Sequence, residues 1–512
     1  MRASSRWARR RPETGLRARR AGVVAVAALP RFCRRPIAMA DHYHGRMAHD
    51  SEPPASADTP PRPGTPRRRA LIRLVRSRGR RILLQFGLPW GGALLVGLAA
   101  VLYANWSTAA YNQFIAWIAG RPWLAFIITP SFTVLAVFLT RRWFSGSEGS
   151  GIPQVIAALH APRDETLMKR LFGLRVIAGK LGISLLGFLG GMTIGREGPT
   201  VHIGAAIMAE TRRFYPHRGP RLERQLLLAG AAAGLSGAFN TPLAGIIFAI
   251  EEIARDFENR TNGTMITAVV FSGLTSLALA GNYLYFGQLN VPHSFSIHFV
   301  LPVLLTALLC GLLGAAFNWA LLRWEVWMPR PLQLWRANKP LLYALIIGLA
   351  IAALGVSTGG ETWGSGYEQA RRLLEGTAPL SQGYAITKWA SMIISYMAGI
   401  PGGLFSPSLS IGAGLAQWVH AAFAWAPLPA LIALCMTGYL AAVTQSPLTS
   451  FVIVMEMTNG SGLVIPMMAT ALLATRVSAL FTPPLYEALA QKNYIPKAPA
   501  PQPAPSTASE AV

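Results

Sequence analysis

A short glycine-rich stretch places two ionisable side chains in the middle of a strongly apolar sequence. The motif GREGP covers residues 195–199, and Arg196 and Glu197 stand between its two glycines. A charged side chain at the centre of a bilayer costs a few kcal/mol, so such residues usually mark an ion or proton route. The motif therefore predicts a functional site.

Two further stretches share the pattern of this motif. GSGIP (149–153) and GLFSP (403–407) also begin with Gly, end with Pro and lead into an apolar segment. Proline is favoured in the first turn of a helix, and glycine lets the preceding backbone turn freely. A helix start offers unpaired N–H groups and a partial positive charge, which suit an anion. If the three starts meet, they form an anion site without a full positive charge. Single Gly/Pro kinks in packed helices are the alternative, and the repeated pattern argues against them.

A second acidic feature is the pair Glu251 and Glu252, which ends the apolar stretch FNTPLAGIIFAIEE (239–252). Carboxylates at that position predict a proton route if they face the interior. A solvated helix end beside Arg255 and Asp256 is the alternative.

Two more polar residues lie in apolar runs. Lys180 either raises the local potential for anions or extends its amine to the membrane surface. His202 could titrate near neutral pH, but we expect it to serve helix packing.

The composition excludes a soluble protein. Of 512 residues, 52% are hydrophobic and 13% are charged, and the mean hydropathy is +0.37, whereas soluble domains carry roughly 25% charged residues. Long apolar runs such as 299–317 recur, and Gly or Pro breaks several runs before the roughly 20 residues of a full span. We expect an all-α, polytopic membrane protein with tilted and partial helices.

The net charge of +25 is concentrated at the N-terminus. Residues 1–82 hold 21 of the 47 Lys and Arg but 5 of the 22 Asp and Glu. A basic flank before the first membrane span predicts a cytoplasmic N-terminus facing the lipid surface. No aromatic or helix-turn-helix pattern accompanies the arginines, so nucleic acid is not an expected partner.

The sequence contains no set of residues for catalysis or metal binding. The three cysteines are scattered, and Cys310 and Cys435 lie in apolar runs as small hydrophobic residues. We expect no enzyme activity, no metal and no cofactor.

Internal similarity suggests two repeats. NTPLAGIIFAIEE (240–252) aligns with QSPLTSFVIVMEM (445–457), and GREGPTVHIGA (195–205) aligns with GLFSPSLSIGA (403–413). Transporters often place their site between two such repeats. The alignment matches Glu251 with Glu456, which predicts a structural role for both. The expected parts are a basic, disordered segment at 1–82, membrane repeats at 83–285 and 286–490, and a short Pro/Ala-rich tail at 491–512.

The three motifs, in this order and separation, resemble the selectivity filter of the CLC family of chloride channels and proton/chloride exchangers. The similarity extends from about residue 83 to 490 and includes AGAAAGLSGAFNTPLAGIIFAIEE (229–252) and PLYEAL (484–489). It implies an inverted repeat and a homodimer in which each subunit has its own anion pathway.

The resemblance also implies roles for individual residues. The hydroxyls of Ser150 and Tyr486 and the N–H groups of Leu404 and Phe405 would bind chloride. Relatives that favour nitrate tend to carry Pro where this chain has Ser150, which points to chloride. The other selectivity-filter residues would be Gly149, Gly151, Ile152, Pro153, Gly195, Arg196, Gly198, Pro199, Gly403, Ser406 and Pro407.

Two glutamates would move protons. By the resemblance, Glu197 is the external gating residue that competes with chloride, and Glu252 passes protons to and from the cytoplasm. Many channels of the family carry a neutral residue at the second position, so Glu252 favours an exchanger.

The sequence thus predicts an antiporter that exchanges chloride for protons across a bacterial inner membrane. The bacterial assignment follows from the lack of the cytoplasmic regulatory domains usual in eukaryotic relatives. A passive, voltage-gated-type chloride channel is the nearest alternative. A cation transporter would need several carboxylates facing the site, and a membrane enzyme would need a catalytic set.

Overall fold

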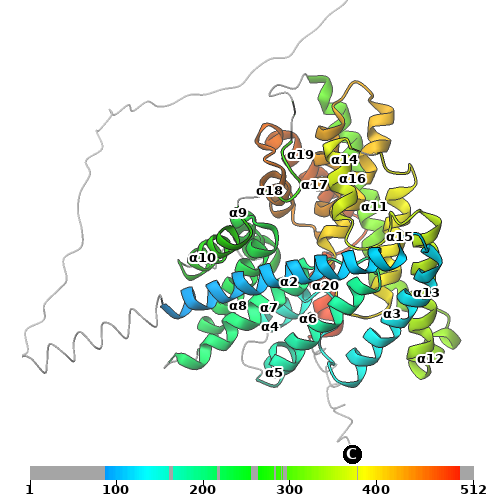
Figure 1. Cartoon of the computed structure of the whole chain (residues 1–512). Helices are drawn as coiled ribbons and strands as arrows, with labels where there is room; N and C mark the ends of the chain where they lie inside the picture. The colour runs from blue at the N-terminus through cyan, green and yellow to red at the C-terminus, as the bar shows by residue number, and fades with distance from the viewer. Residues whose placement is uncertain are drawn as a thin grey trace, which may run out of the picture. The chain divides into compact units, whose positions relative to one another are not determined.

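The computed structural model describes most of the chain between residues 87 and 495 (Figure 1). The described residues are 87–160, 165–215, 219–254, 263–281, 284–289, 291, 297–377 and 379–495. The expectations for 1–82 and for most of the tail lie outside these residues, as do Arg255 and Asp256.

The described residues form an all-α protein, as the sequence predicted. They contain no extended strand, and β-type pairing is limited to isolated bridges. The principal helices are α2 (Leu88–Ile118), α3 (Ala125–Arg142), α4 (Ile152–His160), α5 (Glu165–Phe172), α6 (Leu174–Leu189), α7 (Glu197–Glu210), α8 (Pro220–Phe239), α9 (Pro242–Phe248), α10 (Gly263–Ala280), α11 (Val300–Trp327), α12 (Arg330–Asn338), α13 (Pro340–Ser357), α14 (Tyr367–Glu375), α15 (Tyr384–Met397), α16 (Phe405–Ala422), α17 (Leu428–Thr444), α18 (Pro447–Thr458), α19 (Val464–Ala479) and α20 (Leu485–Asn493).

Seven helical segments of the described chain are long and apolar enough to cross a membrane. Their outer faces are apolar: on α11, Leu304, Leu308 and Leu312 are each nearly half exposed. This four-residue spacing puts them on one face of the helix, while Cys310 and Gly311 on the same helix are buried. An exposed leucine stripe opposite a small-residue face is typical of a helix between lipid and protein. The chain is a multi-pass membrane protein.

Other helices fill the interior between these spans. Helices α7 and α8 cross closely, because a Cβ on Gly230 would lie 2.7 Å from the Cα of Ala205, well below the normal 3.5–4.0 Å carbon contact. In α17 every residue from Ala430 to Thr444 is buried. These helices are surrounded by protein, so they need not span the bilayer.

The two aligned segments begin with the same turn. The C-cap residues of α8 and α17 are Asn240 and Gln445, both in the left-handed conformation (φ 57° and 58°), and a proline starts the next helix two residues later. Helix α9 then continues as a π-helix, η4 (Ala249–Ala254), a form often found at functional sites.

The aligned glutamates cap each other's segment. Glu251 accepts hydrogen bonds from the N–H groups of Leu448 (3.0 Å) and Thr449 (2.6 Å) in the first turn of α18. Glu456 accepts from Leu243 (3.1 Å) and Ala244 (2.7 Å) in the first turn of α9. A carboxylate at a helix start satisfies unpaired N–H groups and complements the helix dipole. This is the structural role that the alignment predicted for Glu251.

We expect Glu456→Gln to lower the free energy of unfolding by about 1–3 kcal/mol, because hydrogen bonds to an ionised acceptor are stronger than those to a neutral amide. Thermal unfolding in detergent would measure the loss. Glu375→Gln is the matched control, since Glu375 forms an exposed pair with Arg371 and such pairs contribute little. An unchanged melting temperature for Glu456→Gln would contradict the capping role.

Candidate functional site

Backbone pairing brings the three glycine-rich motifs together. Gly195 and Gly403 exchange hydrogen bonds, with N···O distances of 2.8 Å and 2.6 Å. The N–H of Gly149 donates to Ile400 (3.2 Å), and the N–H of Gly402 donates back to Gly149 (3.3 Å). The third motif and the residues just before it therefore pair with both other motifs, although they lie more than 200 residues further along the chain.

Each motif leads directly into a helix, as predicted. Helix α4 begins at Ile152, α7 at Glu197 and α16 at Phe405. The motif prolines lie in the first turns: Pro153, Pro199 and Pro407. The structure thus gathers three helix N-termini at one place.

Glycine is required where the first two motifs touch. A Cβ on Gly198 would lie 2.7 Å from the carbonyl oxygen of Ser150 and would also clash with its hydroxyl. Gly151 has φ 106°, a conformation that favours glycine, and a Cβ there would lie 2.8 Å from the carbonyl of Gly198. The motif glycines allow the helix starts to approach each other.

The four residues expected to bind chloride are buried near the place where α4, α7 and α16 begin. The side chains of Ser150, Leu404, Phe405 and Tyr486 are each at most 3% exposed. The Phe405 ring stacks on Tyr486 with centroids 6.0 Å apart, and Tyr486 lies in the first turn of α20, which packs against α4 (Figure 1).

Two hydroxyls at this point lack a hydrogen-bond partner. The Ser150 and Tyr486 hydroxyls lie close enough to interact weakly with each other, but neither oxygen has a hydrogen-bond partner within 3.5 Å among the described residues. Buried hydroxyls are normally satisfied by protein, water or ligand. Two donors at one place, beside helix N-termini, can hold an anion.

The carboxylate of Glu197 is fully buried at the start of α7. It accepts a hydrogen bond from the Ser406 hydroxyl, and the Ser406 N–H lies 3.4 Å from its other oxygen. A Cβ on Gly195 would clash with this carboxylate. The carboxylate of Glu197, in the second motif, therefore contacts the first turn of α16, the helix that follows the third motif.

The Arg196 side chain extends toward α2. Its guanidinium donates to the carbonyl of Ala104 (3.1 Å) and to the hydroxyls of Thr108 (3.3 Å) and Tyr285 (3.4 Å). It also lies 5.4 Å from the centre of the Tyr285 ring. These contacts anchor the second motif to neighbouring elements.

Glu252 lies in η4 and is 1% exposed. The hydroxyl of Ser446, the N-cap residue of α18, donates to its carboxylate, and Glu252 also interacts electrostatically with Tyr486. The alternative that Glu252 belongs to a solvated helix end is therefore wrong, because its carboxylate is enclosed by protein.

The two remaining polar candidates are also enclosed. Lys180 is fully buried and its amine donates to the carbonyl of Gly149 (3.1 Å), so the alternative that it reaches the membrane surface is wrong. His202 packs edge to face on Phe172, with ring centroids 4.9 Å apart, as expected for a packing residue.

Sequence reasoning missed three polar residues. Ser446 and Tyr285 bond to site residues, and Lys388 is fully buried with its amine 2.8–3.2 Å from three carbonyls. Lys388 stands 15 residues before Gly403, as Lys180 stands 15 before Gly195. Extending the repeat alignment upstream would have found it.

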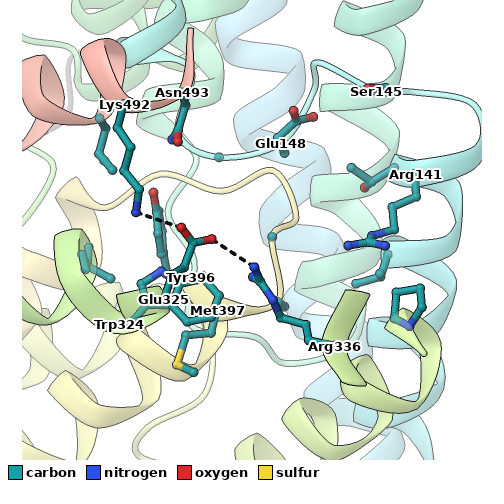
Figure 2. Close-up of a pocket in the computed structure, with 18 of the residues that line it drawn as sticks. Arg141, Ser145, Glu148, Trp324, Glu325, Arg336, Tyr396, Met397, Lys492 and Asn493 are labelled. Atoms are coloured by element: carbon teal, nitrogen blue, oxygen red, sulfur yellow. Dashed lines mark hydrogen bonds and ion pairs between the residues drawn. The ribbon is translucent and has the colours of Figure 1, made fainter. Parts of the chain in front are cut away.

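Two cavities reach the motifs, and they share no lining residue. One, of about 420 Å³, is lined by Gly149 of the first motif together with Glu148 and charged residues from other helices. Figure 2 shows Glu325 between Lys492 (2.9 Å) and Arg336 (3.2 Å) in this cavity. The other, of about 390 Å³, is lined by Arg196 and Tyr285. Glu197 itself lines neither cavity and is fully buried.

Comparison with known proteins identifies the family. A family profile described as voltage gated chloride channel matches residues 132–479. The chain is 31% identical over 422 residues to the H(+)/Cl(-) exchange transporter ClcA of Klebsiella pneumoniae subsp. pneumoniae, covering 78% of this chain and 86% of that protein. It is 30% identical over 449 residues to ClcA of Cronobacter sakazakii, covering 83% and 92%.

Solved structures show the same fold. A slow cyanobacterial Cl-/H+ antiporter aligns with a TM-score of 0.67 at 24% identity, covering 79% of this chain and 97% of that one. A CLC-type fluoride/proton antiporter aligns with a TM-score of 0.66 at 20% identity, covering 78% and 96%. With its sequence relatives and this shared architecture, the chain belongs to the voltage gated chloride channel family, the CLC family.

Proposed function

We propose that this protein is a transporter that exchanges chloride for protons. The observation that carries the proposal is the placement of two buried glutamates, Glu197 and Glu252, around unpaired hydroxyl donors and converging helix starts. The relatives named H(+)/Cl(-) exchange transporter support this activity.

Chloride binds between the hydroxyls of Ser150 and Tyr486 and the N–H groups of Leu404 and Phe405. Both hydroxyls lack another acceptor, and the two N–H groups lie at the start of α16, where no helical acceptor exists. Dipoles and hydroxyls bind an anion without a formal ion pair. Such a site holds chloride and still releases it, which transport requires.

Glu197 couples chloride to protons by competition. Ionised, its carboxylate occupies an anion position and accepts the donors of Ser406, which belong to the third motif. Protonated, it is neutral, so its attraction to helix starts weakens and it leaves the position to chloride. Proton binding and chloride binding thus become linked through one site.

Glu252 carries the proton at a second position. It is buried and bonded to Ser446, so it can exchange protons only through protein or confined water. Because it interacts with Tyr486, it lies close enough to the anion site to sense its occupant. Conduction of chloride alone requires no acidic group here, so Glu252 favours exchange over a passive chloride channel, the alternative function within the family.

We further propose a homodimer in a bacterial inner membrane, with a cytoplasmic N-terminus and one pathway per subunit. Apolar side chains on α10 and α19, such as Val270 (53% exposed) and Ile465 (80% exposed), offer a face for a second copy. The basic segment 1–82 supports the orientation.

Proton uptake by proteoliposomes tests exchange against passive conduction. The vesicles hold a chloride gradient and no initial pH gradient, and potassium with valinomycin clamps the voltage near zero. We expect chloride to drive protons uphill. Chloride flux without proton movement would instead establish a channel.

Glu197→Gln mimics the protonated side chain permanently. We expect proton flux to fall by at least about 100-fold, the usual contribution of a positioned proton-transfer group, while chloride still flows. Parallel chloride and proton electrodes would record both fluxes. Glu210→Gln, at the partly exposed end of the same helix, should behave as wild type. Full coupling in Glu197→Gln would refute the gating role.

Glu252→Gln removes the second proton carrier without touching the anion donors. We expect the same loss of proton flux with chloride affinity unchanged, because Ser150 and Tyr486 remain in place. Isothermal titration with chloride would check the affinity. A proton flux equal to that of the wild type would place the internal route elsewhere.

A further inference from the structure

A directed series of polar contacts leads from the cavity beside Arg196 to the Glu197 carboxylate. The Arg196 guanidinium donates to the Tyr285 hydroxyl (3.4 Å), and that hydroxyl lies 3.4 Å from the Ser406 hydroxyl. Ser406 in turn donates to Glu197. Because arginine can only donate and the ionised carboxylate can only accept, each hydroxyl donates toward Glu197.

The Ser406 side chain adds a contact that the backbone does not supply. Without it, the carboxylate would keep only the Ser406 N–H, at 3.4 Å, which is a long hydrogen bond. The hydroxyl makes the shorter of the two contacts. An alanine at this position would preserve the helix start and the N–H but lose the stronger donor.

The hydrogen bond from the Ser406 hydroxyl stabilises the ionised state of Glu197 and not the protonated state that has left the position. Hydrogen bonds to an ionised carboxylate are roughly twice as strong as neutral ones, so the hydroxyl favours the ionised Glu197 over the protonated one. Once the side chain leaves, the contact is lost. A donor that favours one of two competing states shifts the balance between them.

The Tyr285 hydroxyl contacts the Ser406 hydroxyl on the side away from Glu197. It is 3% exposed and packs edge to face against Phe239 (5.3 Å) and Tyr367 (4.7 Å). Its hydroxyl occupies the acceptor side of Ser406, which leaves the serine proton for Glu197. Tyr285 is therefore a positioning residue that acts through Ser406.

The other groups near Glu197 do not duplicate this effect. The titratable groups of the described residues that interact electrostatically with Glu197 are Tyr103 on α2, Tyr285 and Tyr486 on α20, and Arg196 is its neighbour in the chain. Tyr103 bonds to Ser184 (2.7 Å). Among the described residues, Ser406 is the one whose hydroxyl donates a hydrogen bond to the Glu197 carboxylate.

We propose that the Ser406 hydroxyl, oriented by Tyr285, sets the proton concentration at which Glu197 yields its position to chloride. The proposal rests on the gating role of Glu197 and adds the residue that tunes it. Loss of the Ser406 hydroxyl lets the Glu197 carboxylate accept a proton and leave its position more readily.

The test is chloride turnover in proteoliposomes as a function of pH for Ser406→Ala. Because the hydroxyl stabilises the ionised form, its removal should move the half-maximal pH upward by about one unit, the shift expected for losing one hydrogen bond to a charged group. Ser408→Ala is the matched control, since its hydroxyl lies in the same helix, is buried and bonds to no described residue. A Ser406→Ala profile that coincides with wild type would overturn the proposal.

Further variants separate this proposal from the gating role itself. Ser406→Cys keeps the size and weakens the donor, so it should shift the profile in the same direction by less, and Tyr285→Phe should do likewise. In a Glu197→Gln background, Ser406→Ala should cause no further shift. A shift that persists there would overturn the tuning role, whereas normal coupling in Glu197→Gln alone would overturn the proposed function.

Discussion

The reciprocal hydrogen bonds between Gly195 and Gly403 are the constraint on which the site depends. Non-helical backbone at membrane depth must find internal partners, and this pair satisfies four such groups at once. The pairing uses the backbone just before α7 and α16, so the N–H groups of the first helical turns remain available. Any side chain larger than hydrogen at Gly195 would push Glu197 away. The proposed anion site therefore depends on the way these backbone groups are paired.

Four acidic residues are each held by contacts from the other half of the sequence. Glu197 bonds to Ser406 and Glu252 to Ser446, while Glu251 and Glu456 each cap a helix about 200 residues away. The capping pair stabilises the interface between the halves, and the serine-bound pair is the one to which we assign proton exchange. Stability and the proposed transport activity therefore depend on the same boundary between the two halves. A relative shift of the halves would change the contacts of all four carboxylates.

Local chemistry made part of this structure predictable from sequence. Gly and Pro at the three motifs defined the helix starts, and the alignment of Glu251 with Glu456 indicated a shared structural role. Burial could not be predicted in the same way: Lys180 in an apolar run fits a lipid-facing and an interior position equally well, and only packing decides. The contacts of Ser406, Ser446 and Tyr285 were missed for a related reason. Single hydroxyls carry no sequence pattern, and Tyr285 comes from a segment without helical periodicity.

The placement of the buried lysines is consistent with reversible binding at the proposed anion site. Lys180 donates to the carbonyl of Gly149, and Lys388 donates to three carbonyls. Neither amine has a described hydrogen bond to Glu197. An ammonium in direct contact with the carboxylate would form a strong ion pair in a low-dielectric interior and would hold the gate shut. Carbonyls occupy the amines instead, so hydroxyls and N–H groups make the direct contacts. Such contacts are weaker than an ion pair, as the proposed replacement of the Glu197 carboxylate by chloride and the proposed tuning by the Ser406 hydroxyl require.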